Sequence, residues 1–274
     1  MDTKITATAT VLTYNSARTL ADCLAPLAAF DEILVLDGGS SDETLAIARR
    51  FGARIEPQAE RPGPVADFTA VRERSFKLAS HDWIFVVDSD ETADSELISA
   101  IRSAVSGDDR TRAYRVERVP VVNGKTIRYA YFSPDRIIRL VNRGTARWEP
   151  GKRVHEHLAL APGTLISDLA GMLKTVWPSL VECRRKDRRY LALAMSKPLA
   201  RRPPFAAAVR AIFKNAARSV GILFCAFYLT GRYGRTGAVL PFAYHLRFVR
   251  YHAAVVRERF RQLVYGQRYT PPAA

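Results

Sequence analysis

The sequence predicts an α/β protein with a mostly parallel sheet, helices on both faces of that sheet, a small antiparallel addition and a basic helical C-terminal region. Strand-like and helix-like segments alternate through residues 7–105, which is typical of a parallel sheet with right-handed crossovers. Residues 83–87 form an apolar run bounded by charges, as expected for a strand covered on both faces. Residues 184–274 are rich in arginine and place apolar side chains at helical spacing.

The N-terminal elements follow one another in a regular order. The first strand, residues 7–12, ends in a polar loop whose Asn15 or Ser16 is suited to cap the next helix. That helix has an apolar face formed by Leu20, Cys23, Leu24 and Leu27. The second strand, residues 32–36, runs into a glycine-containing turn, and Ser41 or Asp42 then caps a helix that extends to residue 51. A short strand at residues 53–55 precedes a loop rich in proline and glycine.

The central strand ends in a group of carboxylates. A helix predicted over residues 64–79 leads into it, and Asp88, Asp90 and Glu91 follow its apolar run. Ligands of open α/β sheets bind beyond the carboxyl ends of the strands, so these acids lie where a substrate is expected. Such hard oxygen ligands suit Mg²⁺ or Mn²⁺. The alternative, that the two aspartates are turn residues and Glu91 is a solvated charge at a helix start, stays open on these residues alone.

The pattern becomes antiparallel after a helix capped by Asp94. Residues 114–122, an Asn-Gly turn and residues 125–131 predict a hairpin, and residues 136–141 add a strand. Arg136 and Arg139 are three positions apart on that strand. Side chains alternate between the faces of a strand, so these two cannot both contact one ligand.

Five motifs occur in order over about 150 residues. They are Val-Leu-Thr-Tyr-Asn at 11–15, Asp-Gly-Gly-Ser-Ser-Asp-Glu-Thr at 37–44, Asp-Trp at 82–83 leading to Asp-Ser-Asp-Glu at 88–91, Pro-Asp-Arg-Ile-Ile-Arg-Leu at 134–140, and Val-His-Glu at 154–156. In this order and spacing the chain resembles the family 2 glycosyltransferases of GT-A fold, in particular the lipopolysaccharide-core glucosyltransferases. Residues 72–75, Arg-Glu-Arg-Ser, depart from the family pattern, which often has an Asn there.

The resemblance implies a metal-dependent transfer of a sugar from a nucleotide-sugar, with UDP-sugar expected over GDP-sugar. A divalent cation, Mg²⁺ or Mn²⁺, then offsets the negative charge that develops on the departing diphosphate. By resemblance Asp90 ligates the metal, and Asp88 lies near the donor ribose or shares the metal shell. Thr13, Asn15 and Asp37 hold the base and ribose in the same interpretation. The alternative is helix capping for Thr13 and Asn15 and an Asx-turn for Asp37. For Asp42, capping is preferred.

An inverting transfer also requires a general base for the acceptor hydroxyl. The candidates are Glu156 and Glu91, and Glu156 is preferred because the resemblance places it on the acceptor side. Its neighbour His155 is within reach of the metal or the diphosphate in this interpretation, and Arg136 or Arg139 binds the diphosphate. Without the resemblance, residues 155–157 would be interpreted as a solvated loop.

Charge divides the chain in two. Residues 1–183 hold 23 Lys and Arg against 25 Asp and Glu, a net −2, whereas residues 184–274 hold 19 against 2, a net +17. We therefore predict a catalytic domain over residues 1–183, with a donor half at about 1–115 and an acceptor half at about 116–183. Residues 184–274 form a basic amphipathic helical region.

The basic region predicts contact with an anionic membrane surface and not with nucleic acid. Its longest apolar run, residues 220–229, has ten residues against the ~20 needed to span a bilayer, so helices over 205–264 are expected to lie in the interface. Packing of these helices on the catalytic domain is the alternative. The expected location is the cytoplasmic face of the bacterial inner membrane, as a peripheral or monotopic protein.

Three function classes follow from the sequence. The first is an inverting, metal-dependent glycosyltransferase that acts on a glycolipid or other lipid-linked, lipopolysaccharide-type acceptor. The second is a nucleotidyltransferase, although residues 13–18 do not form the Gly-rich phosphate loop that such enzymes use. The third is a non-catalytic basic protein that binds membranes or nucleic acid. Three widely spaced cysteines, Cys23, Cys183 and Cys225, indicate neither a zinc site nor a disulfide framework, and no signal peptide is indicated. The oligomeric state is not predicted.

Overall fold

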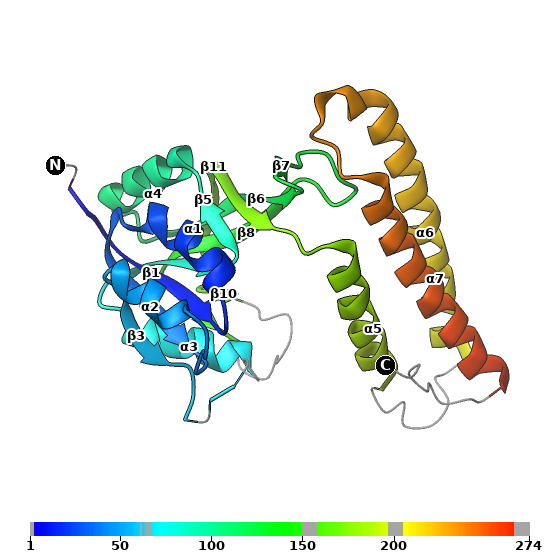
Figure 1. The fold of residues 1–274 in the computed structure, drawn as a ribbon, viewed down its shortest axis with the longest axis horizontal. Helices are drawn as coiled ribbons and strands as arrows, with labels where there is room; N and C mark the ends of the chain where they lie inside the picture. The colour runs from blue at the N-terminus through cyan, green and yellow to red at the C-terminus, as the bar shows by residue number, and fades with distance from the viewer. Residues whose placement is uncertain (1–2, 61, 64–66, 150–157, 197–204, 266–274) are drawn as a thin grey trace. The chain divides into compact units, whose positions relative to one another are not determined.

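The computed structural model describes residues 3–60, 62–63, 67–149, 158–196 and 205–265 (Figure 1). The chain divides into two compact units. One contains residues 1–119 and 135–176, and the other contains residues 120–134 and 177–274. The second unit therefore includes a segment from the middle of the chain, and the boundary predicted at residue 183 stays a prediction.

The main sheet of the described residues has nine strands, of which all but β7 lie wholly or mostly in the first unit, and its parallel part comes first in the chain. Strands β1 (Ile5–Thr13), β2 (Phe30–Asp37), β3 (Arg54–Pro57) and β4 (Trp83–Asp88) pair in the order β3-β2-β1-β4, all parallel. The sheet continues through β8 (Asp135–Asn142), β6 (Arg112–Val122), β11 (Leu165–Val176) and β5 (Glu91–Ala93). In this second part β8 is antiparallel to both β4 and β6, and β5 is antiparallel to β11.

Helices cover both faces of this sheet, as predicted. Helices α1 (Ala17–Leu27), α2 (Thr44–Arg50) and α4 (Ser95–Gly107) share one apolar core with alternate residues of the strands, such as Ala9 and Val11 of β1. Helix α3 (Phe68–Leu78) packs on the opposite face, against Leu34 and Ile84. Residues 33–36 of β2 and 83–87 of β4 are buried on both faces of the sheet, which explains why these two strands have continuous apolar runs, whereas β1 alternates Thr with Ala and β3 is mostly exposed or half-buried.

The antiparallel hairpin is confirmed, with a shorter second strand than predicted. Strand β7 is only Lys125–Thr126 and pairs with the end of β6. Asn123 and Gly124 both have positive φ, 51° and 74°, as the tight hairpin turn requires. Strands β9 (Ala146–Trp148) and β10 (Leu158–Leu160) form a separate two-stranded antiparallel sheet.

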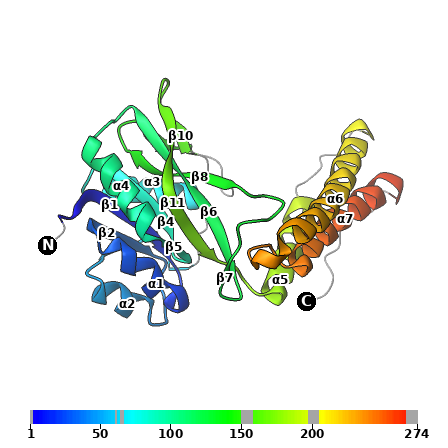
Figure 2. The same ribbon diagram turned by 90° about the horizontal axis from the view of Figure 1, so that it is seen from above.

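The second unit is helical, as predicted. It contains α5 (Leu180–Ser196), α6 (Phe205–Tyr233), a 3₁₀ turn (Gly234–Thr236) and α7 (Phe242–Tyr265), and α6 and α7 run side by side (Figures 1 and 2). An apolar cluster joins α7 to the middle segment of the chain through residues such as Val122, Ile127 and Tyr244. Cys23, Cys183 and Cys225 are free cysteines.

Helix α6 corrects the length argument made from the apolar run. Residues Phe205–Thr236 are long and apolar enough to cross a membrane, judged by length and composition only. The 29 residues of α6 extend over about 43 Å. The length of the ten-residue apolar run within α6 is therefore not a reason to conclude that this helix is too short to span a bilayer.

Candidate active site

Parallel pairing brings the predicted polar residues of three strands to one edge of the sheet. Thr13 at the end of β1 pairs in register with Asp37 at the end of β2, and Leu12 pairs with Asp88 at the end of β4. These are the carboxyl ends of the strands, where ligands of open α/β sheets bind.

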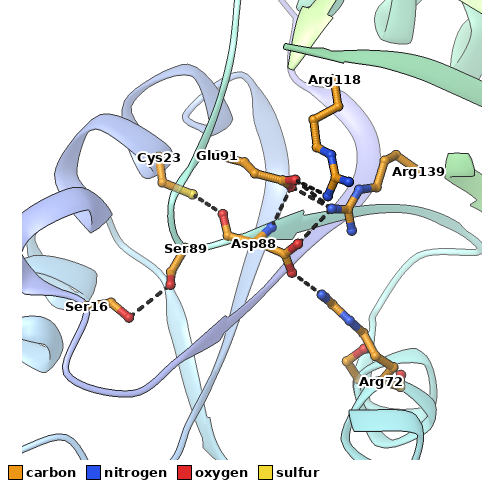
Figure 3. A network of polar contacts seen from close by, with 9 residues as sticks. Ser16, Cys23, Arg72, Asp88, Ser89, Glu91, Arg118 and Arg139 are labelled. Carbon is orange, nitrogen blue, oxygen red and sulfur yellow. Dashed lines mark hydrogen bonds and ion pairs between the residues drawn. The ribbon is translucent and has the colours of Figure 1, made fainter. Parts of the chain in front are cut away.

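Asp88 is held by two buried arginines (Figure 3). Arg139 Nη2 lies 2.7 Å from Asp88 Oδ2, and Arg72 Nη2 bonds the other carboxylate oxygen. Burial acts to raise the pKa of Asp88, but Arg139 and Arg72 outweigh it and hold that pKa well below its usual range. The two arginines fix the direction of the ionised Asp88 carboxylate. Because the side chain is still 37% exposed, a ligand can reach it.

Glu91 is buried behind Asp88 and belongs to the same network. Its carboxylate accepts hydrogen bonds from Arg139 Nη2 at 2.7 and 2.8 Å and from the Asp88 backbone N–H at 2.9 Å. Arg118 lies 3.7 Å from it and is itself paired with Asp135 at 2.8 Å. Burial raises the pKa of Glu91. The positive charge of Arg139 opposes this shift and the negative charge of Asp88 adds to it, and the pKa remains raised. This environment suits Glu91 to positioning Arg139, and its predicted role as an alternative base stays a prediction.

Arg136 and Arg139 have separate surroundings, although both lie on β8. Arg136 is exposed and pairs with Asp168 at 2.9 Å, whereas only 7% of Arg139 is exposed. The diphosphate contact predicted for one of these arginines stays a prediction, and in the structure Arg139 pairs with the carboxylates of Asp88 and Glu91.

Like Arg118 of β6, Arg72 is a site residue that the sequence interpretation missed. It lies on α3 with Val71 and Phe76 on the buried side, and only 2% of it is exposed. A signal was present, since Arg72 is four positions from both Phe68 and Phe76 and so falls within a predicted apolar face. An arginine there requires a buried acidic partner.

Asp37 organises the turn after β2. Its carboxylate accepts bonds from Thr13 Oγ1 at 2.7 Å, from the Gly39 and Ser40 N–H groups at 2.7 Å each, and from Ser40 Oγ at 2.6 Å. This is the Asx-type turn that the sequence left as the alternative. The donor-binding role predicted for Thr13 and Asp37 stays a prediction, and their fixed geometry is compatible with it.

The cap predicted at Asp94 is confirmed, whereas Asn15 and Ser16, the candidates for the first helix, are arranged differently in the structure. Asn15 has a left-handed φ of 49°, and its Oδ1 accepts from the Ser41 N–H at 2.9 Å, which ties the first loop to the second. Ser16 makes no capping bond, and its hydroxyl lies 2.9 Å from Ser89 Oγ. Asp42 accepts from the first N–H of α1, at Ala17, and from that of α2, at Thr44. One carboxylate therefore serves two helix N-termini, because the turns after β1 and β2 are adjacent.

The donor set for a divalent cation consists of hard carboxylates. Asp90 is exposed in the turn after β4, two residues beyond the partly exposed Asp88. Within the described ranges no group of three His, Cys, Asp or Glu side chains is arranged to hold a metal ion. His155 and Glu156, predicted as a metal ligand and the general base, lie outside those ranges. The metal-ligand role predicted for Asp90 and Asp88 stays a prediction; both are hard oxygen donors, and a cation held by them would take its other ligands from the substrate and water.

Comparison with known proteins identifies relatives over the first part of the chain. Residues 8–151, slightly more than half of it, match the family model described as Glycosyl transferase family 2. Lipopolysaccharide core biosynthesis glycosyltransferase LpsC of Rhizobium meliloti is 26% identical over 158 residues, which cover 56% of this chain and 57% of that protein. An uncharacterized glycosyltransferase of Rickettsia felis is 27% identical over 137 residues, covering 48% of this chain and 46% of that protein. The chain thus spans about half the length of these curated relatives.

Solved structures show weaker similarity. TarS 1-349 of S. aureus in complex with UDP is 16% identical, with a TM-score of 0.45, and covers 97% of this chain and 93% of that one. Glucosyl-3-phosphoglycerate synthase of Mycobacterium tuberculosis, in complex with Mn²⁺, UDP and glucosyl-3-phosphoglycerate, is 21% identical with a TM-score of 0.32 and covers 42% of this chain and 44% of that one. Both TM-scores are below 0.5.

Proposed function

Since the chain belongs to glycosyl transferase family 2, we propose that this glycosyltransferase is an inverting, metal-dependent enzyme that moves a sugar from a UDP-sugar to a lipid-linked or lipopolysaccharide-type acceptor. The observation that carries the proposal is the edge of the sheet where Thr13, Asp37, Asp88 and Asp90 come together. Family membership also disfavours the nucleotidyltransferase and the non-catalytic alternatives.

Asp90 and Asp88 would hold Mg²⁺ or Mn²⁺, which when bound offsets the charge that develops on the departing diphosphate. The chain prepares this position by keeping Asp88 ionised, because Arg72 and Arg139 hold its pKa low. Glu91 in turn fixes Arg139 through two contacts of 2.7 and 2.8 Å. The carboxylate is thus oriented before the substrate arrives, so little reorganisation is needed during transfer.

Two side chains remain candidates for proton removal from the acceptor hydroxyl. Glu156 is the proposed base, by resemblance to the family. Glu91 is less suited to it, because its side chain is 1% exposed and bound to Arg139, whereas a base must reach the hydroxyl directly or through one water.

The proposed acceptor class rests on two observations. The LpsC relative is named for lipopolysaccharide core biosynthesis. In addition, α6 exposes an apolar stripe formed by Phe213, Val220, Phe224, Phe227 and Tyr228, which are 58–76% exposed. With 3.6 residues per turn these side chains share one side of the helix, and Arg210, Lys214 and Arg218, four positions apart, form a basic row beside them. Such a helix is suited to lie in an anionic membrane surface.

We accordingly assign residues 1–183 to the catalytic domain and residues 184–274 to membrane association. The donor half would be residues 1–115, approximately, and the acceptor half the remainder of the catalytic domain. The proposed location is the cytoplasmic face of the bacterial inner membrane, where both a nucleotide-sugar and a lipid-linked acceptor are accessible.

The test is a screen of UDP- and GDP-sugars for metal-dependent hydrolysis by the full chain with Mn²⁺. We expect one UDP-sugar to be turned over and chelation to abolish the reaction. Asp90→Asn should lower turnover about 100-fold or more at saturating metal, because a metal-bound charge is lost. Asp22→Asn, an exposed carboxylate on α1, serves as the control and should leave turnover unchanged. Near-normal turnover in Asp90→Asn would remove Asp90 from the metal shell, and failure of every nucleotide-sugar would contradict the proposed donor.

A further inference from the structure

A groove of about 220 Å³ lies between α5 and α7 within the second unit. Four arginines line it, Arg184 and Arg188 from α5 and Arg247 and Arg250 from α7, together with one acid, Asp187. The charged side chains of the lining thus sum to +3. A groove with this excess favours an anionic ligand.

One of the four arginines is already neutralised and fixed. Arg247 donates from Nε and Nη2 to the two oxygens of Asp187, both at 2.6 Å. Its guanidinium carbon also lies 4.6 Å from the centre of the Phe248 ring. Two parallel bonds and a ring contact hold this side chain in place, so it forms a rigid part of the groove wall.

The other three arginines carry the excess charge. In the part of the chain that the structure describes, Arg184, Arg188 and Arg250 make no ion pair and no side-chain hydrogen bond, and all three are exposed. Arg184 and Arg188 are four residues apart and therefore point from the same side of α5, while Arg250 faces the groove from α7. Guanidinium groups so placed match the several acceptor oxygens of a phosphate.

The remaining lining is apolar. Leu180 and Leu191 of α5 and Ala254 of α7 line the groove, and Leu191 packs against Val255 in a small apolar cluster. A free phosphate ion gains nothing from such a floor, whereas the glycerol and first methylenes of a lipid do. Lipid access is expected because the same unit exposes the apolar stripe of α6.

We propose that this groove binds the phosphate headgroup of an anionic membrane lipid, with Arg184, Arg188 and Arg250 on the phosphate and the apolar floor under the start of the acyl chains. The groove shares no residue with the proposed active site or with the α6 stripe. It rests on the proposed membrane association for its supply of ligand, but not on sugar transfer.

The test measures binding of a soluble lipid, so that vesicle adsorption does not enter. Dihexanoyl phosphatidic acid, kept below its micelle concentration, is titrated into the full chain at low salt without a nucleotide-sugar, with inorganic phosphate as a second ligand. The variant Arg184→Gln/Arg188→Gln is compared with Arg185→Gln/Lys186→Gln. Both variants remove two positive charges from residues 184–188 of α5, but residues 185 and 186 do not line the groove.

We expect Arg184→Gln/Arg188→Gln to weaken lipid binding at least about tenfold, since charge-assisted bonds to the phosphate are lost, and the control variant to change it less than about twofold. Inorganic phosphate should bind more weakly than the lipid to the unmodified chain. If the double substitution lowers the Tm, Arg250→Gln on the opposite wall of the groove serves as an independent variant, and it too should weaken lipid binding.

Equal weakening in the two double variants would show a response to net charge and overturn the site. Equal affinity for inorganic phosphate and the lipid would overturn the lipid assignment, and so would a chain that binds neither. Nucleotide-sugar turnover is measured in a separate experiment. A failure of lipid binding therefore does not contradict the proposed sugar transfer, and a failure of turnover does not contradict the lipid site.

Discussion

Arg72 occupies a position on α3 where an arginine is costly unless it meets a buried acid. It meets Asp88, which also contacts Arg139, while Arg139 contacts Glu91. Two carboxylates and two guanidinium groups thus balance in charge. The consequence is a carboxylate at the substrate side whose direction and ionisation are set by residues behind it.

Removal of Arg72 tests this arrangement. Arg72→Met should lower the free energy of unfolding by about 3 kcal/mol, because it leaves Asp88 and Glu91 with one buried cation between them. Arg72→Lys keeps the charge but not the planar guanidinium group. Its free energy of unfolding should therefore lie between those of the unmodified protein and Arg72→Met. Urea unfolding at pH 7 gives the measurement. Unfolding of Arg72→Met at the same urea concentration as the unmodified protein would show that the contact contributes nothing to stability.

The two candidate bases differ in what their loss should do. Glu156→Gln should lower kcat about 10²- to 10⁴-fold, as is usual for loss of a general base, with little change in donor affinity or Tm. Glu91→Gln should lower Tm as well, because its partner Arg139 is buried. Kinetics and thermal unfolding of both variants make the comparison. A silent Glu156→Gln together with a stable, inactive Glu91→Gln would reverse the assignment.

At the scale of elements, β11 approaches the first turn of α4 through a glycine. Gly171 has φ of 84°, and a Cβ there would lie 2.2 Å from the Leu97 backbone nitrogen. The same turn is capped by Asp94, whose Oδ1 accepts from Leu97 N–H at 2.9 Å and from Met172 N–H at 3.1 Å. Strand and helix therefore share one capping carboxylate, and this requires close contact.

Gly163 provides a matched control, because it also has φ of 84° but no atom within 4 Å of the place that a Cβ would occupy. Gly163→Ala should cost about 1 kcal/mol from the left-handed backbone alone. Gly171→Ala should cost about 3 kcal/mol or more, since overpacking against backbone adds to that strain. The free energies of unfolding of the two variants are compared in urea. Equal losses would show that β11 and α4 separate easily.

Glu32 connects β2 to the approach to β4, and it gives the fold a pH dependence. Its carboxylate accepts from Ser80 N–H at 2.7 Å and Ser80 Oγ at 2.8 Å, and it pairs with Arg54 at 3.0 Å. Burial acts to raise the pKa of Glu32, but the bonds from Thr8 and Ser80 and the charge of Arg54 lower it below its usual value. The native state therefore binds fewer protons than the unfolded chain in the acidic range.

The stability from Glu32 should be complete above the unfolded pKa of about 4.3 and should disappear as the pH falls through the lower native value. Glu32→Gln is expected to cost about 1–2 kcal/mol at pH 7 and progressively less as the pH falls below the unfolded pKa of about 4.3. Unfolding of both proteins is measured from pH 7 to pH 3. A difference that stays constant with pH would show that the carboxylate keeps the same pKa in both states.

At the scale of the whole molecule, the excess positive charge and most of the exposed aromatic side chains of the described residues lie in the second unit. Arg247 is not available to lipid, because it is paired with Asp187, whereas the row Arg210, Lys214 and Arg218 makes no ion pair within the described residues. Truncation at Cys183 would also uncover the cluster around Val122 and Ile127, which α7 helps to bury. Point variants of the full chain are therefore the cleaner test.

We expect the full chain to pellet with anionic vesicles and to be only partly released by salt. Arg210→Gln/Lys214→Gln/Arg218→Gln should weaken binding at low salt, because each basic residue near the surface contributes about 1 kcal/mol. Arg49→Gln/Arg50→Gln/Lys77→Gln removes the same charge from the first unit as a control and should bind normally. Phe213→Ser/Phe224→Ser should lose the part that resists salt. Binding unchanged in both of these α6 variants would favour an intramolecular role for α6.

The α/β class, the hairpin, the helical C-terminal region and the carboxylates at the strand end were determined by the sequence itself. Each depends on local periodicity, on turn residues such as Asn123 and Gly124, or on the place of Asp88 and Asp90 directly after an apolar run. The order and spacing of the motifs also indicated the family.

Only the tertiary structure decided the partners. Arg72 and Asp88 are 16 positions apart, Arg139 and Asp88 are 51 apart, and the segment 120–134 joins helices that begin more than 40 residues later. Local sequence patterns do not predict pairs so far apart in the chain, because a buried charge is stabilised by whichever element the fold places beside it. For the same reason Asp42 serves α1 as well as its own helix.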